Sequence, residues 1–275
     1  LVEKRKGRRM TEKVVIGNAT LYLGDCLELM AQIPDGSVDM VLCDLPYGTT
    51  ACKWDSVIPF EPLWAHYKRV IKRNGAIVLT ASQPFTTALI SSNMRDFRYC
   101  WVWEKTRASN PYLANRQPLR AHEDVCVFGG SAYYPQKTEG AAYTISPKAG
   151  GRVASDDRSN SPAFAGKAAS GRFPRSVLRL SNSSAEMGLH PTQKPVALME
   201  YLIRTYTKEG ETVLDNCMGS GSTGVACVQL GLAFTGIERE RKYFDIACER
   251  ISRAQAQGQL IPPEPAPDMV QEGLL

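Results

Sequence analysis

A glycine-rich segment late in the chain limits the possible folds more than any other feature. Residues 215–224 read Asp-Asn-Cys-Met-Gly-Ser-Gly-Ser-Thr-Gly, between an apolar strand-like run at 212–214 and a helix-like run at 222–230. Glu238 lies 23 residues after Asp215, at the end of the next strand-like run. Such a βαβ unit binds a nucleoside, because glycines let the backbone approach the ligand and the acid accepts hydrogen bonds from ribose hydroxyls.

The position of this loop predicts a permuted chain order. About fifty residues follow the loop, too few for the remaining strands of a nucleotide-binding sheet. The other strands must therefore come from upstream, where strand-like and helix-like runs alternate with short connections. The expected fold is α/β: a doubly wound, mostly parallel, circularly permuted Rossmann-like sheet with helices on both faces.

Two ligand classes compete for the glycine loop. Its Gly-x-Gly-x-x-Gly spacing also matches the dinucleotide fingerprint, so a nicotinamide-dependent oxidoreductase is one alternative and a glycine turn of chance spacing is another. Asp215 argues against a dinucleotide, because it would repel a pyrophosphate and suits the ammonium group of an amino acid. The sequence thus favours S-adenosyl-L-methionine. The candidate contacts in and after the loop are Asp215, Gly219, Gly221, Thr223 and Glu238.

A second chemical site follows the apolar run at 38–43. It reads Asp44-Leu45-Pro46-Tyr47, at the carboxyl end of a predicted strand, where open α/β sheets bind ligands. Pro46 stiffens the turn and Tyr47 offers an aromatic face. A tight turn with a solvated aspartate is the plainer alternative.

At this motif the chain resembles the amino-group DNA methyltransferases, whose signature is Asp-Pro-Pro-Tyr or a close variant. The resemblance covers about residues 18–128 and 188–257, and it has the β order of that family, in which the catalytic half precedes the cofactor half. Leu45 stands where the family more often has proline. This difference leaves the assignment of the motif intact if the position contributes mainly a backbone carbonyl. The catalytic residues that the resemblance implies are Asp44, Leu45, Pro46 and Tyr47.

Three further segments resemble motifs of the same family. Residues 23–26 resemble the motif that contacts the cofactor's adenine, 190–195 the motif beside its methionine end, and 120–123 the late motif of the catalytic half. The resemblance therefore adds four candidate cofactor contacts, namely Asp25, Cys26, Thr192 and Lys194.

The chemistry of an aromatic amine explains the second site. The amine is a poor nucleophile, because its lone pair is delocalised into the ring. If Asp44 accepts one N–H and a main-chain carbonyl of Leu45 or Pro46 accepts the other, the lone pair becomes localised on nitrogen. Tyr47 would stack on a base that has been flipped out of the duplex.

The resemblance implies methyl transfer to N6 of adenine in duplex DNA. Cytosine N4 is the alternative within the family, and Asp44 favours adenine because cytosine members more often have serine there. Enzymes that act on RNA or on protein glutamine usually have asparagine at that position and the unpermuted order. A DNA-binding relative without activity is disfavoured, because both sites are intact.

The charge distribution indicates where DNA would bind. The chain carries a net charge of +5, and residues 131–190 hold eight lysines and arginines against four acids. The region 129–188 is rich in Gly, Ser, Ala and Pro, so we expect an inserted functional module or partial disorder, where the family places its target-recognition region. A second DNA-facing loop is expected at 105–120, with a plain solvated loop as its alternative. The candidate DNA contacts are Arg107, Arg116, Arg120, Arg152, Arg158, Arg172, Arg175 and Arg179.

The domain organisation follows from these motifs. We expect a disordered basic arm at 1–13, the catalytic half at 14–128, the target-recognition region at 129–188, the cofactor half at 189–258 and a flexible tail at 259–275. Eight scattered cysteines without a Cys-x-x-Cys pair indicate reduced thiols and no metal site.

The sequence also bears on location and partners. No run approaches the ~20 apolar residues of a membrane span, and no apolar signal core begins the chain. A cytoplasmic enzyme of bacterial or phage origin is expected. Relatives with this motif order are often dimers, which suggests a homodimer, and a cognate restriction enzyme is left open as a partner.

Overall fold

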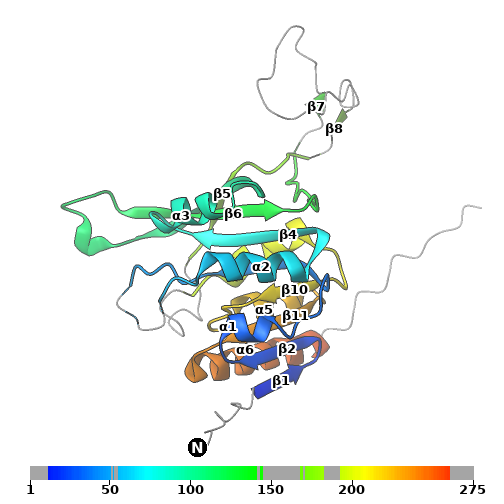
Figure 1. Cartoon of the computed structure of the whole chain (residues 1–275). Coiled ribbons are helices and arrows are strands. Elements are labelled where there is room, and N and C mark those ends of the chain that lie inside the picture. The colour runs from blue at the N-terminus through cyan, green and yellow to red at the C-terminus, as the bar shows by residue number, and fades with distance from the viewer. Residues whose placement is uncertain are drawn as a thin grey trace, which may run out of the picture.

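The computed structural model describes residues 12–50, 52, 55–140, 171–182 and 193–258, together with the backbone of 143–144, 168–169 and 259–260. A mixed sheet of nine strands runs through this part of the chain, in the order β1-β2-β11-β10-β3-β4-β6-β5-β9 (Figure 1). Its strands are β1 (Glu12–Ile16), β2 (Ala19–Leu23), β3 (Val38–Asp44), β4 (Ile71–Ala81), β5 (Phe97–Ser109), β6 (Arg120–Gly129), β9 (Val177–Leu180), β10 (Thr212–Asp215) and β11 (Ala233–Glu238).

The strand order confirms the permuted α/β fold. Strands β10 and β11 come from the last third of the chain, yet they lie between β2 and β3. Strand β10 pairs in parallel with β3, with Val213 opposite Met40. Parallel pairing also joins β2 to β11, β11 to β10, β3 to β4 and β5 to β9. The sheet is therefore mostly parallel, with antiparallel pairing at β1–β2, β4–β6 and β5–β6.

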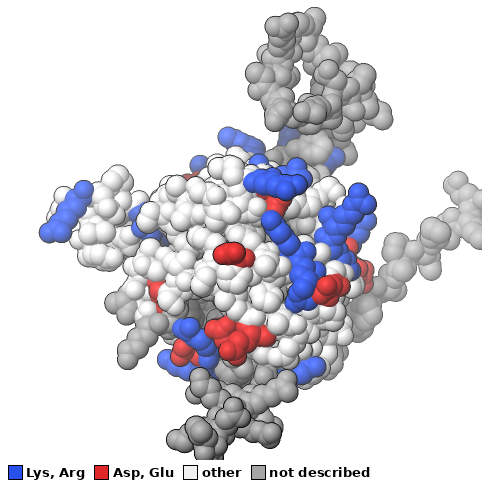
Figure 2. Space-filling view, in the orientation of Figure 1, with Lys and Arg blue, Asp and Glu red and all other residues white. Residues whose placement is uncertain are grey.

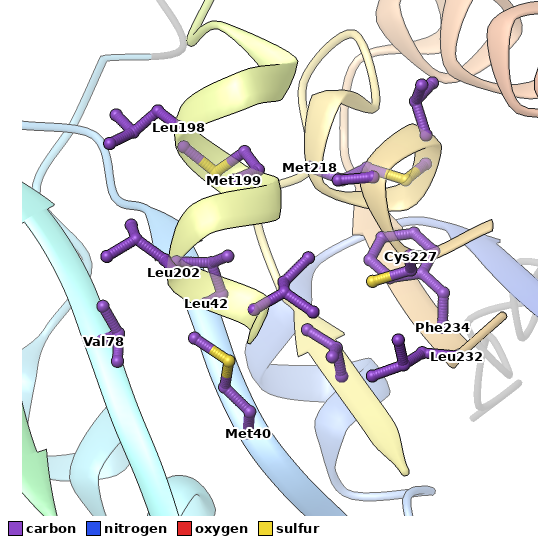
Figure 3. Packing of buried hydrophobic residues seen from close by; sticks show 14 of the residues in the cluster. Met40, Leu42, Val78, Leu198, Met199, Leu202, Met218, Cys227, Leu232 and Phe234 are labelled. Atoms are coloured by element: carbon purple, nitrogen blue, oxygen red, sulfur yellow. The ribbon is translucent and has the colours of Figure 1, made fainter. Parts of the chain in front are cut away.

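Helices cover both faces of the sheet. Its central strand β3 is apolar on both sides, so each of its faces has to be buried under a layer of helices. Met40 and Leu42 belong to one buried cluster, whereas Val41 and Cys43 belong to the other. In the first cluster, Figure 3 shows leucines of α4 facing these residues and Val78 of β4. The helices are α1 (Cys26–Met30), α2 (Phe60–Val70), α3 (Phe85–Ser92), α4 (Val196–Tyr206), α5 (Ser222–Gln229) and α6 (Arg241–Leu260), with a 3-10 turn η1 (Pro111–Leu113). None of the helices in the described ranges is both long and apolar enough to cross a membrane.

Five strands differ from the sequence-based expectation. Strand β1 begins at Glu12, so the last two residues of the predicted basic arm belong to the sheet. Strand β9 lies within the predicted insertion and pairs with β5, and a short pair, β7 (Tyr143–Thr144) with β8 (Ala168–Ala169), also falls there. Strand β5 continues to Ser109, so residues 105–109 are strand and not loop. The Asn182 side chain holds this end, since it accepts from the Arg107 amide and donates to the Arg107 carbonyl.

Candidate active site

Both sequence motifs line one cavity of about 540 Å³ at the carboxyl ends of β3, β10 and β11. This edge is where an open α/β sheet places its ligands. The cavity brings together these predicted site residues: Asp25, Cys26, Asp44, Leu45, Pro46, Tyr47, Arg120, Lys194, Gly219, Thr223 and Glu238. Asp215 and Gly221 are not among the lining residues, and Thr192 lies outside the described residues.

The glycine loop has the geometry that its sequence predicts. Gly219 and Gly221 adopt left-handed backbone angles, φ 52° and 81°, which side-chain-bearing residues rarely adopt. A Cβ on Gly224 would lie 2.5 Å from Ile251 of α6 and 2.7 Å from Phe234 of β11. Glycine at this position therefore lets α5 pack closely against the sheet and α6.

Two acids hold the shape of this loop. Asp215 is buried and accepts hydrogen bonds from the Thr223 hydroxyl, 2.7 Å away, and from the Cys217 amide, 3.1 Å away. Glu238 accepts from the amides of Gly219 and Glu240, at 2.9 and 2.7 Å. Burial raises the pKa of Glu238, and it raises the pKa of Asp215 to about 7.

Arg250 of α6 supports the same loop from behind. Its side chain is buried, and Nη1 donates to the Ser220 carbonyl across 2.6 Å. Sequence analysis missed this contact. The available signal was an arginine beside the apolar helix positions Ala247, Ile251 and Ala254.

Asp25 and Cys26 join the loop to the first helix. The Asp25 carboxylate caps α1 by accepting from the amide of Leu27 at 2.9 Å and that of Glu28 at 3.4 Å. The Gly24 amide donates to the carbonyl of Glu238, at 2.8 Å. The predicted adenine-side motif thus lies directly beside the end of β11.

Asp44, the last residue of β3, has partners on both carboxylate oxygens. Oδ1 accepts hydrogen bonds from the Tyr47 hydroxyl at 2.7 Å and from the Thr80 hydroxyl of β4. Oδ2 accepts from the Lys194 ammonium at 2.6 Å. Thr80 was not predicted, because nothing in the sequence marks a single threonine in an apolar strand.

Tyr47 presents its ring within the same cavity. The ring stacks on Phe85 of α3, with centroids 5.1 Å apart and planes at 24°. Burial, with the charges of Asp44 and Glu123, raises the pKa of Tyr47, so the phenol stays protonated and donates to Asp44. Phe85 is a further aromatic residue of the site that sequence analysis did not identify.

Lys194 links Asp44 to two more charged residues. Its Nζ lies 3.3 Å from Glu123 Oε2, and Glu123 Oε1 lies 3.1 Å from Lys105 Nζ. Burial by itself would lower the pKa of Lys194, but the charges of Asp44 and Glu123 outweigh it and raise that pKa. Burial opposes ionisation of Glu123 too, yet the two lysines outweigh it and lower its pKa. Both groups therefore stay charged.

Asp55 fixes the chain that follows Tyr47. Its carboxylate accepts from the amides of Gly48, Thr49 and Thr50, at 2.9, 3.0 and 2.7 Å. Burial works to raise the pKa of Asp55, but these amides and the Thr50 hydroxyl outweigh it and lower the pKa. The start of the loop that follows Gly48 is thus held by a turn of backbone amides around the Asp55 carboxylate.

The predicted DNA contacts fall into two groups. Arg107 and Arg116 are exposed on the β5–β6 hairpin, which extends past the edge where β3 and β4 end (Figure 1) and bears Lys or Arg side chains in Figure 2. Arg120 on the same hairpin lines the cavity. Arg172, Arg175 and Arg179 are exposed in or before β9, and Arg179 pairs with Glu104 at 2.7 Å. Arg152 and Arg158 lie outside the described residues.

Comparisons with known proteins agree on one family. The family model N6_N4_Mtase, DNA methylase, matches residues 38–249. A curated relative, the Type II methyltransferase M2.LlaDCHI of Lactococcus lactis subsp. cremoris, is 27% identical, over 88% of this chain and 92% of that protein.

Solved structures share the fold. The M1.HpyAVI-SAM complex has a TM-score of 0.57 at 23% identity, over 85% of this chain and 98% of that one. The cytosine-N4-specific PvuII DNA methyltransferase has a TM-score of 0.61 at 15% identity, over 89% and 93%. A DNA modification methylase of Thermus thermophilus, TTHA0409, complexed with S-adenosyl-L-methionine, has a TM-score of 0.55 at 20% identity, over 86% and 95%.

Proposed function

Since the chain belongs to the DNA methylase family and is a DNA methyltransferase that uses S-adenosyl-L-methionine, we propose that its acceptor is N6 of adenine in duplex DNA. The observation that carries the proposal is the Asp44 carboxylate, fixed at the end of β3 in the same cavity as the glycine loop. An aspartate at this position, where the family's cytosine enzymes more often have serine, supports adenine over cytosine.

The residues of the glycine loop fit the cofactor. Glu238 faces the cavity at a strand end and suits ribose hydroxyls, and Asp215 supports the loop from beneath through its bonds to Thr223 and Cys217. Met218 and Cys26 offer apolar contact for an adenine ring. When bound, the cofactor supplies a methyl group on a positively charged sulfur.

The carboxylate of Asp44 has room for one more donor. A carboxylate offers about four lone-pair positions, and Tyr47, Thr80 and Lys194 use three of them. The remaining position accepts one N–H of the amine, and the carbonyl of Leu45 or Pro46 accepts the other. These fixed acceptors localise the amine's lone pair and stabilise the positive charge that develops on nitrogen.

Tyr47 supplies an aromatic surface beside these acceptors, with Phe85 packed against its ring. A base must leave the duplex to reach the cavity, which costs a few kcal/mol, and stacking on an aromatic side chain returns about 1–3 kcal/mol. The Tyr47 ring is held by Phe85 and by its hydrogen bond to Asp44, so it does not have to be ordered when the base arrives.

The duplex itself needs a positively charged surface. Residues 105–122 include the exposed Arg107 and Arg116, the half-buried Arg120 and no acid, and their hairpin borders the cavity through Ser109, Asn110 and Arg120. We assign phosphate contact to this hairpin and target recognition to residues 129–188.

Nucleoside analysis of DNA methylated in vitro tests the proposal. We expect N6-methyladenine, and Asp44→Ala should lower the single-turnover rate on the order of 100- to 1,000-fold while cofactor affinity is kept, because one fixed acceptor is lost. N4-methylcytosine would show that cytosine is the acceptor, and unmodified DNA or appreciable turnover by Asp44→Ala would refute the proposed chemistry.

A further inference from the structure

We propose that Lys194 is a positioning residue that orients the Asp44 carboxylate, and that it is not a contact of the cofactor. This inference rests on the proposed function and deepens it. It departs from the role that the sequence motif at 190–195 implied, because the ammonium group points to the catalytic carboxylate.

The geometry at Lys194 is that of a buried ion pair. Its side chain is 8% exposed, and Nζ lies 2.6 Å from Asp44 Oδ2. The same nitrogen lies 5.6 Å from the centroid of the Tyr47 ring. An ammonium donates hydrogen bonds and accepts none, so all of its bonding capacity serves acceptors such as carboxylates.

Glu123 and Lys105 hold Lys194 in place. Glu123 Oε2 lies 3.3 Å from Lys194 Nζ, and its other oxygen pairs with Lys105, whose side chain is 6% exposed. Lys105 also donates to the Ser109 hydroxyl, at 3.0 Å. Two cations and two anions therefore alternate in one chain of contacts, so the buried charges compensate each other.

These contacts determine the direction from which the Asp44 carboxylate can accept a further hydrogen bond. Tyr47 and Thr80 occupy Oδ1, and Lys194 occupies one side of Oδ2, which leaves a single direction for the amine. Lys194 belongs to the segment before α4, 150 residues from Asp44 in sequence. The half of the chain that holds the cofactor thus also sets the orientation of the catalytic carboxylate.

Variants of the full-length protein test this assignment. For Lys194→Met we expect a single-turnover rate about 100-fold lower at saturating cofactor and DNA, since small misplacement of a reacting group costs that much. The Kd for S-adenosyl-L-methionine, measured by calorimetry, should not change.

Two further variants keep the test informative if Lys194→Met does not fold. Lys194→Arg retains the charge with a different shape and should recover part of the wild-type rate. Glu123→Gln should lower the rate less than Lys194→Met. The matched control is Lys72→Met, which breaks the 2.7 Å pair with Asp39 at the far end of β3 and should change stability without changing the rate.

Three outcomes would overturn the inference. They are a raised cofactor Kd with an unchanged saturated rate, a wild-type rate in Lys194→Met, and a Glu123→Gln variant in which only stability changes. Failure of the proposed function is distinguishable, because the wild-type enzyme would then yield no N6-methyladenine.

Discussion

At Asp215 a carboxylate is buried without a cation in hydrogen-bonding contact among the described residues. Its pKa is raised by burial to about 7, against 3.8 in a solvated chain. Well below pH 3.8 the group is neutral in the folded and the unfolded states, so it costs no stability. As pH rises from 4 to 7 the unfolded chain ionises first, and the folded state loses stability until its own carboxylate has ionised.

The variant Asp215→Asn removes this titration. The variant's free energy of unfolding minus that of the wild type should grow by about 2–3 kcal/mol from pH 5 to pH 8. The wild type loses this stability as the unfolded chain releases its proton, whereas the amide never ionises. The Asn oxygen and nitrogen can still bond to Cys217 and Thr223. Urea unfolding of both proteins at the two pH values measures the difference, and an equal gap at both values would refute a raised pKa.

Single residues differ in how far the sequence reveals them. Asp44, Tyr47 and the glycines were predictable because each sits in a short motif with a backbone or chemical requirement. Phe85 and Asp55 act through a contact with a residue far away or through a turn that composition does not mark. Glu123 lies in the predicted motif at 120–123, but its partners Lys194 and Lys105 could be known only from the fold. Lys194 was predicted as a site residue, but its partner on β3 could be known only from the fold.

Among the elements, the long apolar runs were predictable and the polar ones were not. The run at 38–43 is buried on both faces, so its strand was evident. Strand β9, by contrast, has four residues, and its buried Leu178 is flanked by exposed Val177 and Arg179. Such a strand is ordered by pairing with β5, including the bond from Trp103 Nε1 to the Leu180 carbonyl. Local sequence does not contain that information.

The β5–β6 hairpin is expected to contact DNA phosphates through its exposed arginines. Arg107→Ala and Arg116→Ala should each weaken DNA binding uniformly across sequences and reduce the salt slope of log K by about 1, because each removes one phosphate contact. Arg179→Ala is the internal comparison and should reduce the slope less, since its guanidinium already pairs with Glu104. Fluorescence anisotropy at several salt concentrations gives the slopes, and unchanged slopes in the two hairpin variants would exclude the hairpin from the DNA surface.

At the scale of the whole molecule, the nine-stranded sheet is made from two halves of a permuted chain. Val213 and Leu214 of the cofactor half pair with Met40 and Val41 of the catalytic half at the centre of the sheet. Leu198 and Leu202 of α4 pack in the same buried cluster as Met40 and Leu42 (Figure 3). Neither half can bury its central strand alone, so the two halves should unfold together.

Calorimetry of the full-length protein tests this cooperativity. We expect one thermal transition, and S-adenosyl-L-methionine at 100 times its Kd should stabilise the folded state by about 2.7 kcal/mol, which raises Tm by several degrees. Asp44→Ala should keep this rise, because its change lies at the acceptor. Glu238→Ala should lose it, since it removes the expected ribose contact and the anchor of Gly219. Two transitions, with only the later one moved by the cofactor, would mean that the halves are independent and that their pairing through β3 and β10 contributes little.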